Sequence, residues 1–139
     1  MDAFLTIEAQ QALRAAKTIS PRKGAAGLLI GHKTGRRFFV EKAFPAPSGF
    51  KPTPENLTIL DALFDGRIIG FFRVNPIEKD ERAILQPFAC GKLFLSIESH
   101  SSAESVLISY LIDYDGRFVL EHIPLELEAA SSPKRRVSS

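Results

Sequence analysis

The chain has 139 residues, of which 45% are hydrophobic, so it can build the core of one domain but hardly of two. The net charge is +2, and without the three basic residues of the segment 129–139 it would be −1. The rest of the protein is therefore nearly neutral and lacks the general positive charge that is typical of nucleic-acid-binding domains. The single cysteine, Cys90, excludes an internal disulfide and a cysteine-rich zinc cluster, and we expect it to be a small buried hydrophobe.

The start of the chain does not look like a signal peptide, and no apolar run approaches the roughly 18 residues that a membrane span requires. These features favour a cytoplasmic protein. The first elements are a short strand at 4–7 and a helix at 8–17, in which apolar residues recur at helical spacing. An apolar strand at 25–31 follows and forms a predicted hairpin with a second strand at 36–47.

A second helix has clear signals at both ends. Thr53 supplies a capping hydroxyl, Pro54 suits the first helical position and Glu55 places an acid in the first turn. Gly66 provides the stop signal. The strand at 67–74 that follows is apolar on both faces, which predicts a central position in the sheet.

The last third contains a predicted short helix at 77–86 and a strand at 91–99. Two further strands follow, and Asp115 and Gly116 between them are a strong hairpin signal. The segment 129–139 is predicted to be a disordered basic tail.

This order of elements predicts an α/β protein whose single domain covers residues 1–128. Strands and helices alternate over the first two thirds, and the remaining strands are joined by short turns. We therefore expect a mixed β-sheet with helices packed on its faces.

Three segments of the chain resemble the JAMM/MPN domain, the fold of zinc isopeptidases and deubiquitinases. They are the strand "GLLIG" (27–31), the end of its hairpin partner, "FPAP" (44–47), and the later strand "IIGFFRVNP" (68–76). The resemblance spans about residues 4–127 and implies an MPN-like, cytidine-deaminase-like architecture.

In the catalytic members of that family, two histidines and an aspartate hold zinc, and a glutamate activates the bound water. The resemblance places the glutamate at Gly24 and the histidines at Arg73 and Asn75, while the serine and aspartate fall near Ala83 and Gln86. Arginine does not deprotonate and glycine has no side chain to act as a base. The resemblance therefore implies a metal-free, cofactor-free member that binds protein partners and often dimerises.

Two other interpretations of these positions stay open. In the structural one, Arg73 pairs with an acid of the next helix and Asn75 caps the turn before Pro76. In the enzymatic one, the domain is a metal-dependent isopeptidase or peptidase-like hydrolase with a displaced site.

The displaced site would use His32 or His100 together with Asp80 or Glu81. No two histidines of the chain have metal-ligand spacing. Surface histidines, or histidines with satisfied hydrogen bonds, are therefore the simpler expectation.

A third possibility is a phosphate or nucleic-acid binder. Lys33, Arg36 and Arg37 surround the first hairpin turn and are available for contacts to phosphate, with help from the basic tail. The near-neutral body argues against this function.

Two pairs of adjacent phenylalanines support an interaction role. Phe38 with Phe39 and Phe71 with Phe72 each send one ring to either face of a strand. One ring of each pair is therefore a candidate for an exposed apolar patch, which on a small domain indicates a partner surface.

Overall fold

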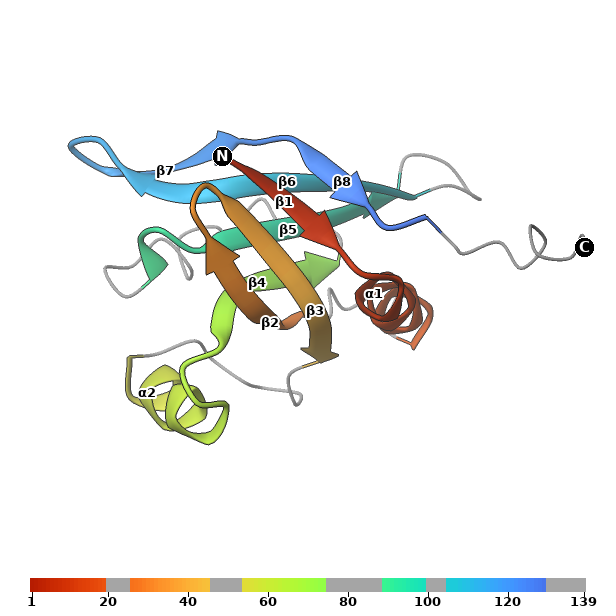
Figure 1. The fold of residues 1–139 in the computed structure, drawn as a ribbon, viewed down its shortest axis with the longest axis horizontal. Helices are drawn as coiled ribbons and strands as arrows, with labels where there is room; N and C mark the ends of the chain where they lie inside the picture. Colours follow the sequence, from red (N-terminus) through yellow and green to blue (C-terminus); the bar gives the residue numbers. More distant parts are fainter. Residues whose placement is uncertain (20–25, 46–53, 75–88, 100–104, 130–139) are drawn as a thin grey trace, which may run out of the picture.

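The computed structural model describes residues 1–19, 26–45, 54–74, 89–99 and 105–129. These residues form eight strands of one mixed sheet and two helices (Figure 1). In chain order, the elements are β1 (Asp2–Leu5), α1 (Ile7–Ile19), β2 (Ala26–Thr34), β3 (Arg37–Pro45), α2 (Pro54–Leu63), β4 (Ile68–Val74), β5 (Leu93–Ser99), β6 (Ser105–Tyr114), β7 (Phe118–His122) and β8 (Leu125–Leu127).

The strands lie in the order β7-β6-β5-β4-β2-β3-β1-β8. Three pairs are parallel, namely β1 with β3, β1 with β8, and β4 with β5. The other neighbours are antiparallel. The strand β4 is therefore central, as its two apolar faces predicted, and it lies between β2 and β5.

The sheet curls into a half-barrel whose two ends meet at the segment between β7 and β8. The N–H of Ile123 donates to the carbonyl of Ser109 in β6 over 3.0 Å, and the Ser109 hydroxyl donates back to the Ile123 carbonyl over 2.6 Å. The next residue, Pro124, accepts a bond from the N–H of Ala3 in β1 over 3.0 Å. These three bonds join the two sides of the sheet at one point.

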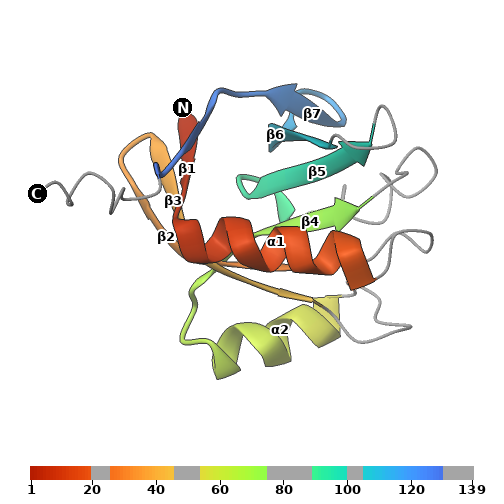
Figure 2. The ribbon, with the colours of Figure 1, turned by 90° about the vertical axis from the view of Figure 1, so that its right-hand side faces the viewer.

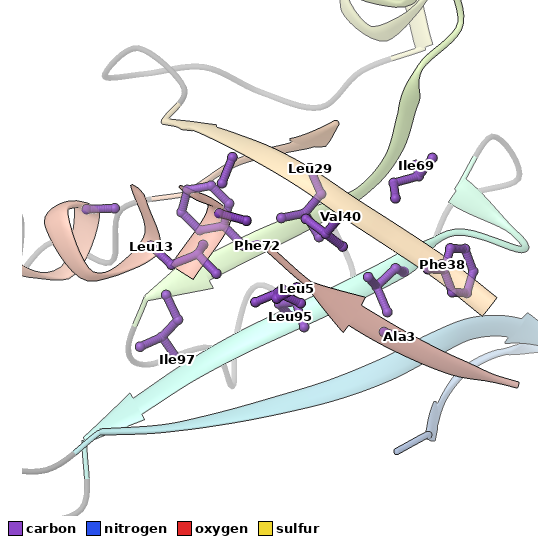
Figure 3. Packing of buried hydrophobic residues seen from close by; sticks show 14 of the residues in the cluster. Ala3, Leu5, Leu13, Leu29, Phe38, Val40, Ile69, Phe72, Leu95 and Ile97 are labelled. Carbon is purple, nitrogen blue, oxygen red and sulfur yellow. The ribbon is translucent and has the colours of Figure 1, made fainter. Parts of the chain in front are cut away.

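The larger core lies inside the curl, where side chains of β1, β3, β4 and β5 meet (Figure 3). The helix α1 lies along the mouth of the curled sheet (Figure 2) and adds Ala9, Leu13 and Ala16 to this core. Its start is fixed by Thr6, whose hydroxyl oxygen accepts the N–H of Ala9 and whose O–H donates to the Glu41 carbonyl in β3.

The smaller core lies on the outer face of the sheet, where α2 packs with Leu60 and Phe64. The two helices therefore lie on opposite sides of β2 and β3 (Figure 2). The end of α2 is a Schellman motif, because the N–H of Gly66 bonds to the Asp61 carbonyl and the N–H of Asp65 bonds to the Ala62 carbonyl. Asp65 and Gly66 both have positive φ, so the predicted stop at Gly66 is confirmed with one further left-handed residue before it.

The predicted fold, an α/β sheet with flanking helices in an MPN-like, cytidine-deaminase-like architecture, is wrong. The protein is mostly β-sheet, curled into a half-barrel with two short helices. The apolar strands suggested helical cover on both faces, but the curled sheet buries much of its inner face against its own strands. The predicted last strand is also divided, since Pro124 separates β7 from β8.

The predicted hairpin of β2 and β3, the first strand and the first helix are confirmed, with ends shifted by one to three residues. The predicted helix at 77–86 lies outside the described residues, and so does nearly all of the predicted tail at 129–139. In the described part of the chain, no helix is both long enough and apolar enough to cross a membrane.

Candidate functional site

The position that the family resemblance singles out most clearly is Arg73, on the outer face of β4. Its neighbours across the ladder are Ala26 in β2 and Ser96 in β5. Ser96 is fully buried, and its hydroxyl donates to the Glu98 carboxylate over 3.1 Å. Arg73 is half-buried and already takes part in an interaction. Arg73, Ser96 and Glu98 therefore form a polar patch on this face of the sheet.

The zinc chemistry of the family does not fit the residue found at this position, because the guanidinium of Arg73 stays protonated and has no lone pair to offer a metal. The other four family positions, Gly24, Asn75, Ala83 and Gln86, lie outside the described residues. Among the residues that the structure does describe, no three histidine, cysteine, aspartate or glutamate side chains group in a way that could hold a metal ion.

His32 is an exposed histidine with satisfied contacts, as expected. Its Nδ1 lies 2.9 Å from Glu41 Oε2, and its ring stacks on Phe39 with 5.0 Å between the centroids. Arg67 also bonds to the Glu41 carboxylate. Burial raises the pKa of Glu41, but the hydrogen bonds from Arg67 and His32 outweigh it, and the net pKa lies below the ordinary value.

The displaced hydrolase site lacks a described partner for His32, because His100, Asp80 and Glu81 all lie outside the described ranges. His122 is exposed on β7, where its ring lies 5.5 Å from the ring of Tyr110. Nothing in the described residues therefore brings two histidines together.

The basic residues at the first hairpin turn are largely used within the protein. Arg37 bonds to Asp2 over 2.8 Å and to Glu126 over 2.7 Å, so it joins β3 to β1 and β8. These hydrogen bonds raise the pKa of Arg37. Lys33 lies over the ring of Phe38, 5.3 Å from its centroid. Only Arg36 of the three is described without such a contact, which weakens the phosphate-binding interpretation.

Cys90 is exposed, so the expectation of a buried cysteine is wrong. It lies in the turn before β5, where Ala89 takes the buried position and Gly91 has a φ of +86°. A turn of this kind directs one side chain inward and leaves the next in solvent.

The phenylalanine pairs do not form the expected exposed patch. Phe71 and Phe72 are both buried, because β4 has a core on each face. In the other pair, Phe38 is buried and Phe39 is half-buried. The prediction of one exposed ring per pair is therefore wrong for β4.

An exposed apolar surface is found on α2 instead. Ile59 is 61% exposed and Leu63, one turn later, is 73% exposed. Phe44 at the end of β3 is 40% exposed, and its ring lies 5.5 Å from that of Phe64. We call Phe44, Ile59 and Leu63 the α2 patch. The apolar residues of this helix are spread more widely than one stripe, and this was a sequence signal for the patch, since a helix can bury only one stripe against a sheet.

A groove of about 400 Å³ opens on the other side of the molecule, at the mouth of the half-barrel. It lies between α1, β6 and β8, and we call it the β6–β8 groove. Its apolar lining is Leu13, Ile97, Leu107, Leu125 and Leu127, and Gln10 and Arg14 complete its lining. The sequence did not predict this groove, because it depends on the pairing of β8 with β1 and on the position of α1, which come from the other end of the chain.

Comparison with known proteins supports the fold and says nothing of activity. No protein-family model and no curated protein matches the chain. Among solved structures, the chain is similar to the solution structure of protein DSY2949 from Desulfitobacterium hafniense, with 25% identity and a TM-score of 0.62. The match covers 94% of this chain and 97% of that one, and the name of that protein specifies no activity.

Proposed function

We propose that this protein is a non-catalytic, metal-free interaction module that works as a scaffold, either as a homodimer or beside another protein chain. In this proposal it is a divergent, cytoplasmic member of the JAMM/MPN family whose catalytic positions have been replaced. The resemblance in the strands around Gly27 and Gly70, together with Arg73 at a ligand position, supports the absence of zinc chemistry.

The observation that carries the interaction role is the α2 patch. Ile59 and Leu63 expose more than half of their surface on adjacent turns of a helix that already buries Leu60 and Phe64. Burying two such side chains against a partner contributes about 1.5–3 kcal/mol each. Exposed apolar side chains gathered in one place are typical of partner surfaces.

Site-specific photo-cross-linking in cells tests this role, with the cross-linking amino acid placed at Leu63. We expect a covalent product with a second copy of the chain or with one other protein, identified by mass. The matched control places the same amino acid at Asp61, which is exposed on the opposite side of α2. A cross-linker at Leu63 that yields no more product than one at Asp61 would refute the α2 patch as a partner surface.

A further inference from the structure

The β6–β8 groove is bordered by two strand edges that no described strand pairs. β8 is the last strand of the sheet and pairs only with β1. β6 pairs with β5 from Ser105 to Leu111, but its ladder with β7 begins at Tyr110. The part of β6 before Ser109 therefore has one edge without a described neighbour.

The hydrogen bonds between β8 and β1 show which main-chain groups of β8 face the groove. The Pro124 carbonyl bonds to Ala3, and the N–H of Glu128 bonds to the Leu5 carbonyl, so these residues face β1. Main-chain groups of successive residues point to opposite edges of a strand. Leu125 and Leu127 therefore direct their N–H and C=O groups away from β1, toward the groove.

The same reasoning applies to β6. Ser109 directs its carbonyl to Ile123, on the side of β7 and β8. Two residues earlier, Leu107 directs its N–H and C=O to the same side, and the side chain of Leu107 also lines the groove. The groove thus offers a row of main-chain donors and acceptors on each wall above an apolar floor.

The free edge of β6 lacks the usual devices that keep an edge strand from pairing, whereas β8 has two of them, Pro124 before its first residue and the charged Glu126 within it. Such devices are charged side chains, prolines and bulges. β6 instead has Val106, Leu107 and Ile108 in a row, with Val106 39% exposed. Across the groove, Leu127 is 47% exposed.

We propose that the β6–β8 groove binds an extended segment of another protein, which adds a strand to the free edge of β6 or β8 and places alternate apolar side chains in the groove. Only an extended chain satisfies a row of main-chain groups, and an inserted strand lies about 4.7–4.9 Å from the edge it pairs with. This proposal rests on the interaction role proposed above, but not on the α2 patch.

The end of this chain itself is a poor occupant for the groove. Residues 130–139, which begin three residues after the end of β8, contain one large apolar residue, Val137, together with three basic ones. The groove is lined by four leucines and an isoleucine, and burying cations there without partners is unfavourable. A partner segment with apolar residues at every second position fits this lining better.

Hydrogen exchange of the free, full-length protein gives the first test. We expect the amides of Leu107, Leu125 and Leu127 to exchange rapidly, and the amide of Glu128, which bonds to Leu5, to be protected. Protection of all three leucine amides in the free protein would show that the groove is already filled, by the tail or by a second copy, and would overturn the proposal.

Selection of displayed random dodecapeptides on the full-length protein gives the second test. We expect enrichment of sequences with apolar residues at alternate positions, and slower exchange of the Leu107, Leu125 and Leu127 amides when such a peptide is bound. Leu127→Lys should weaken binding at least about tenfold, because the groove would have to bury an ammonium group. Leu63→Lys, which adds the same charge at an exposed leucine of α2, should leave binding within about twofold.

The outcomes separate the two proposals. Peptides whose binding falls with Leu63→Lys but not with Leu127→Lys would refute the groove and support the α2 patch. If the selection enriches no peptide whose binding depends on Leu127, the groove does not bind extended segments, and this proposal is refuted whatever the cross-linking at Leu63 shows. Leu127-dependent peptides combined with no cross-link at Leu63 would support the groove and refute the α2 patch.

Discussion

Replacing Gly70 with alanine should destabilise the protein at the centre of the sheet. Gly70 lies in β4 opposite Leu93 of β5. An ideal Cβ on Gly70 would lie 2.2 Å from the carbonyl oxygen of Leu93 and 2.9 Å from its carbonyl carbon and its Cβ. The obstacle is mainly backbone, so one of the two strands has to move by about 1 Å before the contact with the Leu93 carbonyl oxygen becomes tolerable.

Overpacking of this kind costs about 1–3 kcal/mol, while the lower chain entropy of alanine returns about 0.5–1 kcal/mol. Because the approach to the backbone is as short as 2.2 Å, the cost belongs at the upper end of this range, about 2–3 kcal/mol. We therefore expect Gly70→Ala to lower the free energy of unfolding by about 1–2.5 kcal/mol. With a slope of about 2 kcal/mol per molar, urea unfolding should show this as a midpoint lowered by roughly 0.5–1.2 M.

The control is Gly35→Asn in the first hairpin turn. Gly35 has a φ of +61° and open space around it, and asparagine tolerates that conformation. Its midpoint should stay close to wild type. A Gly70→Ala variant that is as stable as wild type would refute the close approach of β4 and β5 on which the central part of the fold depends.

Two further predictions concern the closure of the half-barrel and its pH dependence. Ser109→Ala leaves the buried carbonyl of Ile123 without its hydroxyl partner. Thermal or urea unfolding should therefore show a free energy of unfolding lowered by about 1–3 kcal/mol. An unchanged midpoint would contradict the closure of the half-barrel at this bond. The hydrogen bonds from Arg37 lower the pKa of Asp2 below its ordinary value of 3.8. The stabilisation that the Asp2–Arg37 pair contributes to the folded protein is therefore present above pH 3.8 and is lost as the pH falls through the lowered pKa. Urea midpoints measured down to low pH should therefore converge for the wild type and Arg37→Gln, and a difference that persists in acid would contradict the pairing.

Local signals in the sequence predicted local structure well. The glycine turn between β2 and β3, the proline at the start of α2 and the stop at Gly66 each fix a conformation within a few residues, and all three are confirmed. The two apolar faces of β4 also predicted its central position correctly.

Features that depend on distant pairing could not be predicted. The parallel pairs of β1 with β3 and β8 join segments that lie up to 122 residues apart in the register, as between Ala3 and Leu125. They set the curl of the sheet and create the β6–β8 groove. A sequence pattern shows that a strand is apolar on both faces but does not show whether a helix or another part of the same sheet covers it.

The candidate site was predictable only in part. The family resemblance pointed to Arg73, and the structure puts it on the outer face of β4 beside Ser96. The partner surfaces were not predicted at their true positions, because the exposed apolar residues lie on α2 and at the groove instead of in the phenylalanine pairs.

The most direct test of the central claim, an interaction module without metal chemistry, is the zinc content of the full-length protein. The protein should be expressed with added zinc and desalted under mild conditions before elemental analysis. Our account predicts no stoichiometric metal, because in the proposed family alignment Arg73 takes the place of a ligand histidine and cannot bind zinc. A content of about one zinc ion per chain, retained through desalting, would contradict the account and favour a hydrolase with a displaced metal site.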